Sequence, residues 1–152
     1  QWFDLSKDDK NYIFKESTRA EKKLNFYINE IKSEYNLDNS KICISGFSQG
    51  CMMSINLGLN SKENYNSIVG FSGKIIDQEY LKDKMNKFSN ILLIHGDADE
   101  IVSPNYMLEA KDFFIRNNVK IETNLIKNCG HHIPIEASSI ALNYISKKLN
   151  NS

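Results

Sequence analysis

Hydrophobic residues recur along this chain with two different spacings. Between residues 20 and 35 the apolar side chains return every three to four positions, with polar side chains between them, which predicts an amphipathic helix. Residues 36–40 (NLDNS) are turn-rich, and residues 41–45 (KICIS) then form a short apolar run that predicts a buried strand. A second apolar helix is expected to begin near Gln49.

The same alternation continues to the end of the chain. Residues 78–86 are weakly patterned and fit either a short helix or a long loop. Further strands are predicted at 67–71 (SIVGF), 90–95 (NILLIH) and 120–126, and further helices after Pro104 and after Pro134. Four strands, each followed by a helical pattern, predict βα units in a mostly parallel sheet with helices on both faces. We expect one α/β domain over residues 1–152.

Composition narrows the classes of partner. The chain has 152 residues, of which 41% are hydrophobic, so it can bury a sizeable core. Lys plus Arg and Asp plus Glu both number 19, which argues against binding nucleic acid or an anionic membrane surface. No apolar run approaches the ~18 residues of a membrane span, and the first residues lack a signal-peptide pattern. We therefore expect a small molecule or another protein as partner.

The cysteines and histidines do not suggest a metal or a cofactor. Cys43, Cys51 and Cys129 are an odd number without CxxC spacing, which favours a reducing cytoplasm over disulfides or structural zinc. The adjacent His131 and His132 are a possible metal pair, but no third ligand is spaced nearby. No cofactor motif is found.

The segment GFSQG, residues 46–50, lies between a predicted strand and a predicted helix. A sharp strand-to-helix turn forces its central residue into strained torsions, and Gly46 and Gly50 would let the chain pass without Cβ clashes. Such a turn lifts the Ser48 hydroxyl out of the sheet. The Gln49 amide, at the helix amino terminus, is then suited to stabilise a negatively charged oxygen. The pattern alone is also compatible with a plain glycine-rich turn.

A nucleophilic serine needs a base, and the base needs an acid. In α/β hydrolases both follow the serine, in loops after later strands and in the order acid, then histidine. Here the loop after residues 90–95 contains Asp97, Asp99 and Glu100, and the loop after residues 120–126 contains His131 and His132. Spacing alone does not choose among these candidates. His95 ends a strand and is expected to be a hydrogen-bonded structural histidine.

GFSQG, HGDADEIVSP and CGHHI together resemble the carboxylesterase and acyl-protein thioesterase (phospholipase/carboxylesterase) family of α/β hydrolases. WFDL at residues 2–5 and the Ser-Gly pair at 72–73 also resemble segments of that family. The resemblance implies that Ser48 is the nucleophile, Asp99 the acid and His131 the base. It also implies cleavage of carboxylic esters or acyl thioesters through an acyl-enzyme, the substrate being a small ester, an acylated protein or a lysolipid.

The sequence departs from that family in one respect. Family members carry, upstream of WFD, early strands and an HGxGx-type loop that gives the second oxyanion donor, and no such segment is found here. We therefore expect impaired catalysis, an unpaired flank on the strand at 41–45, and a homodimer as one way to cover it. The alternatives are a non-catalytic hydrolase-like remnant or binding module, and a dienelactone-hydrolase-like or peptidase-like enzyme.

Overall fold

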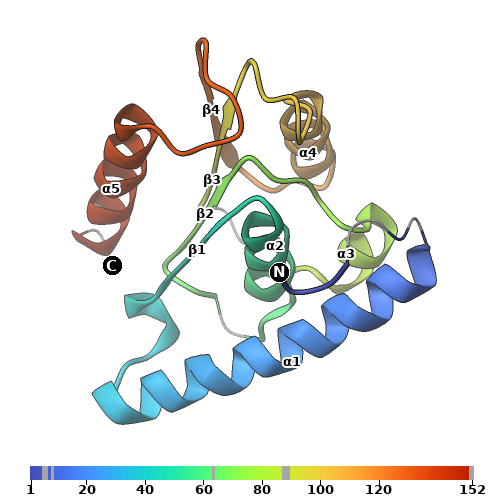
Figure 1. Ribbon diagram of the computed structural model, residues 1–152. Coiled ribbons are helices and arrows are strands. Elements are labelled where there is room, and N and C mark those ends of the chain that lie inside the picture. Colours follow the sequence, from blue (N-terminus) through green and yellow to red (C-terminus); the bar gives the residue numbers. More distant parts are fainter. Residues whose placement is uncertain (5–6, 8, 63, 87–89, 151–152) are drawn as a thin grey trace.

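The computed structural model describes residues 1–4, 7, 9–62, 64–86 and 90–150 (Figure 1). Its centre is a parallel sheet with the strand order β1-β2-β3-β4. The strands are β1 (Cys43–Phe47), β2 (Ser67–Phe71), β3 (Ile91–Gly96) and β4 (Ile121–Ile126). Because all four strands run parallel, their carboxyl ends lie together along one edge of the sheet.

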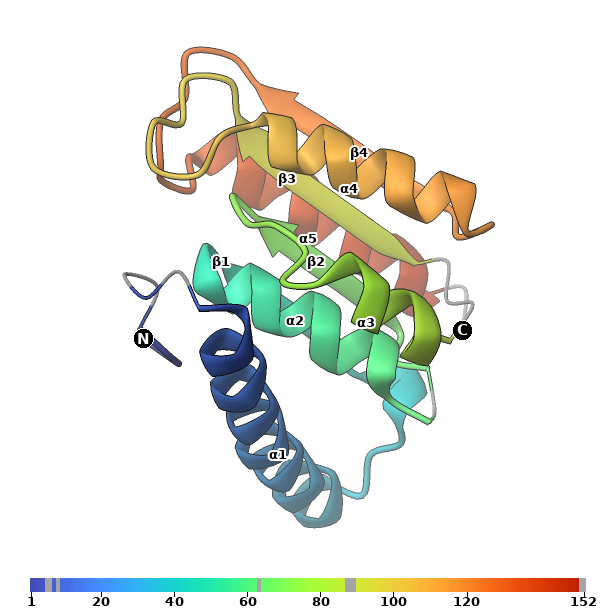
Figure 2. The ribbon, with the colours of Figure 1, turned by 90° about the vertical axis from the view of Figure 1, so that its right-hand side faces the viewer.

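The helices form a layer on each face of this sheet (Figures 1 and 2). They are α1 (Lys10–Tyr35), α2 (Gln49–Asn60), α3 (Gln78–Lys84), α4 (Asn105–Arg116) and α5 (Ile135–Asn150). Right-handed crossovers between consecutive parallel strands place α2, α3 and α4 on the same face. The chain leaves β4 for the opposite face, which α5 covers. The predicted α/β class with helices on both faces is confirmed.

Each face of the sheet has its own hydrophobic core. Ile68, Ile91 and Leu93 point toward α2 and α4, where Ile55 and Phe114 are fully buried. Val69, Leu92 and Ile94 alternate with them and point toward Ala137, Ala141 and Tyr144 of α5. The near-continuous apolar runs of β2 and β3 follow from this burial on both faces.

Helix α1 and strand β1 differ from the predicted ranges by two residues or more, and the structure decides the state of residues 78–86. Helix α1 begins ten residues before the predicted start, because the Asp9 side chain caps it by accepting hydrogen bonds from two amides of its first turn. Strand β1 runs two residues later than predicted, because Asn39–Lys41 form a 3-10 turn capped by Asp38. The weakly patterned residues 78–86 contain α3, capped by Asp77.

Strand β1 forms one edge of the sheet. Among the described residues it pairs only with β2, so the predicted unpaired flank is present. Helix α1 packs on α2 rather than on the sheet (Figure 2), through Ala20 and Met53. Beside the edge lies a groove of about 250 Å³ lined in part by Trp2, Ile28 and Ile44. Leu5, part of the quoted WFDL segment, lies outside the described residues.

None of the helices in the described parts of the chain has the length and apolar character needed to cross a membrane.

Candidate active site

Ser48 occupies the turn between β1 and α2, at the carboxyl edge of the sheet. Its backbone has φ 55° and ψ −117°, a conformation that costs a non-glycine residue about 1–3 kcal/mol. The turn is held by a hydrogen bond of 2.8 Å from the Ser48 N–H to the Phe71 carbonyl at the end of β2. The local fold therefore keeps a strained serine in place by joining it to the neighbouring strand.

The two glycines of the turn are not equivalent. A Cβ on Gly46 would lie 2.2 Å from the carbonyl carbon and oxygen of Gly50, so glycine is required where the strand passes the first turn of α2. A Cβ on Gly50 would meet nothing within 4 Å. The expectation that both glycines relieve a clash is therefore correct for Gly46 and wrong for Gly50, whose side faces the groove beside β1.

The backbone N–H and the side chain of Gln49 lie in different surroundings. Its backbone N–H lies in the first turn of α2, where amides have no intrahelical acceptor and the helix dipole favours negative charge. Its buried side chain accepts a hydrogen bond of 2.5 Å from the Trp2 N–H and donates one of 2.7 Å to the Phe3 carbonyl. This clamp on the amino-terminal segment was missed from the sequence, because nothing in a side-chain pattern reveals backbone partners 46 and 47 residues away.

Asp99 follows β3 and its side chain is completely buried. Oδ1 accepts hydrogen bonds from the Ile101 N–H at 3.0 Å and the Val102 N–H at 2.9 Å. Burial of this carboxyl raises its pKa, but the hydrogen bonds from Val102, His131 and Ile101 together outweigh burial and hold the pKa below its ordinary value. Asp99 is therefore a buried carboxylate that stays ionised at neutral pH.

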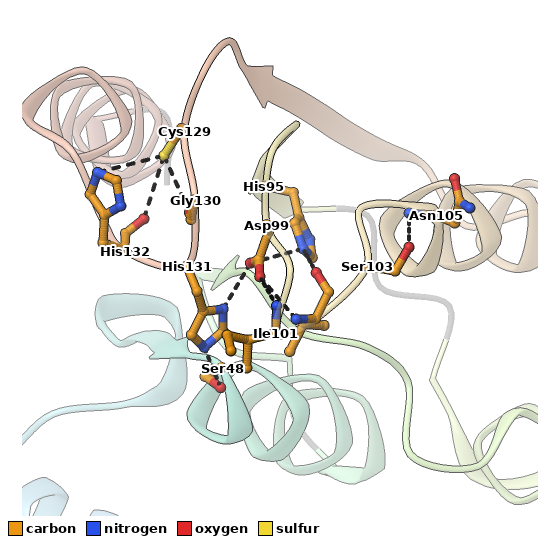
Figure 3. A network of polar contacts seen from close by, with 11 residues as sticks. Ser48, His95, Asp99, Ile101, Ser103, Asn105, Cys129, Gly130, His131 and His132 are labelled. Atoms are coloured by element: carbon orange, nitrogen blue, oxygen red, sulfur yellow. Dashed lines mark hydrogen bonds and ion pairs between the residues drawn. The ribbon is translucent and has the colours of Figure 1, made fainter.

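His131 lies between Asp99 and Ser48 (Figure 3). Its Nδ1 is 2.8 Å from Asp99 Oδ2, and its Nε2 is 3.0 Å from Ser48 Oγ. An ionised carboxylate can only accept, so Nδ1 carries the proton and Nε2 is left as the acceptor for the serine hydroxyl. The ring also packs on Phe47, with 4.7 Å between centroids. The structure thus brings together Ser48, His131 and Asp99, the three side chains singled out through the family resemblance.

The loops that carry the acid and the histidine are joined to each other. The Ala98 N–H donates to the Cys129 carbonyl at 3.0 Å, and the Asp97 N–H donates to the Ile126 carbonyl at 3.0 Å. A Cβ on Gly96 would lie 2.1 Å from the Cys129 carbonyl oxygen, so the close approach of the loops requires glycine there. The relative position of Asp99 and His131 is therefore fixed by backbone contacts.

The other candidates from the sequence point elsewhere. Asp97 and Glu100 are exposed, and His132 lies against Cys129, with 3.9 Å between Nε2 and Sγ (Figure 3). All three cysteines are free, and burial raises the pKa of Cys51, behind the turn, to about 12. No cluster of three or more His, Cys, Asp or Glu side chains suited to a metal ion is found in the described part of the chain.

His95 is buried, as a structural histidine would be, but its contacts could not be predicted from the sequence. Its Nε2 lies 2.8 Å from the Val102 carbonyl and 3.4 Å from Asp99 Oδ2. The only signal available in the sequence was its place at the end of β3, four residues before Asp99. Position along a strand does not reveal on which carboxylate a side chain converges.

The chain is similar to known proteins over most of its length. Residues 1–149 match the sequence profile of the family described as Phospholipase/Carboxylesterase. An acyl-protein thioesterase 1 from Yarrowia lipolytica is 28% identical over 116 residues, which cover 72% of this chain and 51% of that protein. An acyl-protein thioesterase 1 homolog from Dictyostelium discoideum is 27% identical over 118 residues, covering 76% and 52%. The chain thus spans about half the length of these curated relatives.

Solved structures show the same fold. The crystal structure of esterase PE8 superposes with a TM-score of 0.88 at 26% identity, over 97% of this chain and 69% of that one. Acyl-protein thioesterase 2 from Zea mays superposes with a TM-score of 0.69 at 18% identity, over 97% and 72%.

Proposed function

The chain belongs to the phospholipase/carboxylesterase family, and we propose that it is a serine hydrolase that cleaves carboxylic esters or thioesters through an acyl-enzyme on Ser48. The observation that carries this proposal is the continuous hydrogen-bonded path from Ser48 Oγ through His131 to Asp99. A turn that served only as a connection would need neither the strained serine nor a buried carboxylate behind the imidazole.

The geometry supports the following acylation step. Ser48 Oγ bonds to the acyl carbon while its proton moves to Nε2 of His131, and the carbonyl electron pair moves onto the oxygen. The Gln49 N–H stabilises that oxyanion, and Asp99 stabilises the imidazolium. When the intermediate collapses, the bond to the alcohol or thiol breaks and the proton on Nε2 passes to the leaving group.

Deacylation repeats these steps with water. His131 takes a proton from the attacking water, whose oxygen bonds to the acyl carbon. Collapse then breaks the bond to Ser48 Oγ, which recovers a proton from Nε2, and the carboxylic acid leaves. The substrate, one water molecule and the three side chains together balance the atoms and charges of both steps.

The substrate class follows from family membership and chemistry. Two relatives carry the name acyl-protein thioesterase, which favours an acyl ester or thioester over the substrates of a dienelactone-hydrolase-like or peptidase-like enzyme. We propose a small ester, an acylated protein or a lysolipid as substrate. We also propose that the protein works in a reducing cytoplasm, and the free thiols of Cys43, Cys51 and Cys129 support this location.

The described residues offer one clear donor for the oxyanion, the Gln49 N–H. Loss of a second donor typically lowers kcat by ~10²–10³. We propose that this chain alone acts slowly and that a longer chain, with upstream strands and an HGxGx-type loop, turns over ~10²–10³ faster. Equal turnover of the two chains on the same p-nitrophenyl ester would contradict the oxyanion argument. Alternatively, a homodimer could cover the unpaired flank of β1 in place of upstream strands. It would be seen as a doubled mass in solution.

Labelling with a fluorophosphonate probe tests the proposed function. The unmodified chain should form a covalent adduct at Ser48, because only an activated hydroxyl reacts at a useful rate. Ser48→Ala should abolish the adduct, whereas Ser45→Ala, at an exposed position of β1, should leave it unchanged. An unlabelled but folded wild-type chain would instead favour the non-catalytic remnant or binding module. A series of p-nitrophenyl esters and thioesters of increasing acyl length then defines the substrate.

A further inference from the structure

His95 is the second imidazole in contact with Asp99. It lies on β3 with 2% of its surface exposed, and Nε2 faces two oxygen atoms, the Val102 carbonyl at 2.8 Å and Asp99 Oδ2 at 3.4 Å. A carbonyl oxygen and an ionised carboxylate oxygen can only accept hydrogen bonds. The proton of His95 therefore sits on Nε2, which is shared between a short bond to Val102 and a longer contact to Asp99.

These contacts close a ring around the acid. The Val102 N–H donates to Asp99 Oδ1, while the Val102 carbonyl accepts from His95. The turn that carries the carboxylate is thus fastened to β3 by a side chain of β3 itself. Figure 3 shows the two imidazoles reaching Asp99 from opposite sides, so that both contact Oδ2.

We propose that His95 is a positioning residue for the hydrolase reaction: its Nε2–H holds the turn at 99–102 so that Asp99 Oδ2 faces Nδ1 of His131. This inference rests on the proposed function, because the position of Oδ2 matters to catalysis only if His131 is the base. A carboxylate that could rotate would accept a hydrogen bond from His131 in only a fraction of the molecules and from other donors in the rest. The imidazole would then lose the support that keeps its acceptor nitrogen toward Ser48.

The test compares His95→Gln with His95→Met, two unbranched side chains of similar length. Glutamine keeps an N–H donor near the place of Nε2, and methionine does not. The rate constant of fluorophosphonate labelling and kcat for a p-nitrophenyl ester should fall ~10–100-fold in His95→Met, with KM changed by less than about threefold. In His95→Gln both rates should return to within about fivefold of wild type.

A double-mutant cycle separates positioning from general support of the fold. Since His95 acts through Asp99, His95→Met should lower the labelling rate less than about threefold further when Asp99 is already asparagine. An equal loss in both backgrounds, or no advantage of Gln over Met, would overturn the inference.

Three further outcomes are informative. If His95→Met does not fold, His95→Asn replaces it, since its amide is one methylene too short to reach Val102; equal rates for Asn and Gln would then overturn the inference. If the wild-type chain and His95→Met label at the same rate, the positioning role of His95 is contradicted, but the proposed hydrolase function is not. A folded wild-type chain that never labels defeats the proposed function and this inference with it.

Discussion

On the β3–β4 side of the site, Asp99 is enclosed by backbone amides and two imidazoles, and the loops that carry Asp99 and His131 are bonded to each other. On the β1 side, Ser48 and Gln49 lie at the edge of the sheet, next to an open groove. The proposed acid and base are held by many contacts among neighbouring elements. The nucleophile is held by one strained turn, one bond to Phe71 and a clamp on the amino-terminal segment.

This difference indicates which part of catalysis the chain can supply by itself. In the proposed reaction, proton transfer depends on groups that the β3–β4 side already holds in place. Oxyanion stabilisation depends on amides at the β1 side, where the sheet ends and one donor is evident. Variants on the first side should therefore change the rate more than the stability, and variants that displace the turn on the second side should change both.

Asp99→Asn should give the largest effect. The amide would keep an acceptor for the backbone N–H groups but would present an N–H to His131, favouring the tautomer whose Nε2 cannot accept the serine proton. The labelling rate and kcat should fall ~10⁴-fold. The matched control is Asp97→Asn, at an exposed position of the same loop, which should change both by less than about twofold. A comparable loss in Asp97→Asn would contradict the assignment of the acid.

Gly46→Ala should have the next largest effect, with Gly50→Ala as its control. The new Cβ at position 46 would lie 2.2 Å from backbone atoms, so β1 and α2 must separate. We expect unfolding free energy to fall by at least about 2 kcal/mol, and the labelling rate to fall ~10²-fold as Ser48 shifts. Gly50→Ala meets open space on a helix and should change stability by less than about 1 kcal/mol, in the stabilising direction. Urea unfolding of both variants measures this, and equal midpoints would refute the asymmetry.

The parts of the fold that depend on local pattern were predictable. Strand β2 occurs where its apolar run placed it, and β3 and β4 begin one residue later than predicted. The start of α1 was predicted too late, because residues 10–19 lack a clear apolar period and the helix there depends on the Asp9 cap. Helix α3 is short and weakly patterned, so tertiary packing of Leu81 rather than periodicity decides its state.

The site was predictable in a different way. Strand ends and chain order restricted the candidates to two loops, but they could not choose Asp99 over Asp97 or His131 over His132, and only the family resemblance did so. In the structure, the burial of Asp99 and the contacts that fix each loop support this choice. Side-chain periodicity carries no information about two other contacts of the site. These are the contact of His95 with Asp99 and the hydrogen bonds of Gln49 to residues far away in the sequence.

Gln49→Ala should give the smallest of these effects and isolates the clamp from the oxyanion donor, since alanine keeps the backbone N–H. The Trp2 N–H loses its acceptor, and the Phe3 carbonyl loses the bond from Gln49 but keeps its 2.9 Å bond from the Gln1 side chain. Stability should fall by about 1–2 kcal/mol. Because Trp2 is the single tryptophan, acrylamide quenching of its fluorescence should increase well below the unfolding midpoint.

The matched control for this variant is Gln78→Ala, at an exposed position of α3. We expect it to lower the stability by less than about 0.5 kcal/mol and to leave the quenching of Trp2 unchanged. The labelling rate of folded Gln49→Ala should stay within about fivefold of wild type, because the amide at the start of α2 is retained. A loss of labelling as large as that of Gly46→Ala, without extra quenching of Trp2, would show that the Gln49 side chain acts on the reacting atoms. The amino-terminal segment would then not be what it holds, and the β1 side would depend on a contact other than this clamp.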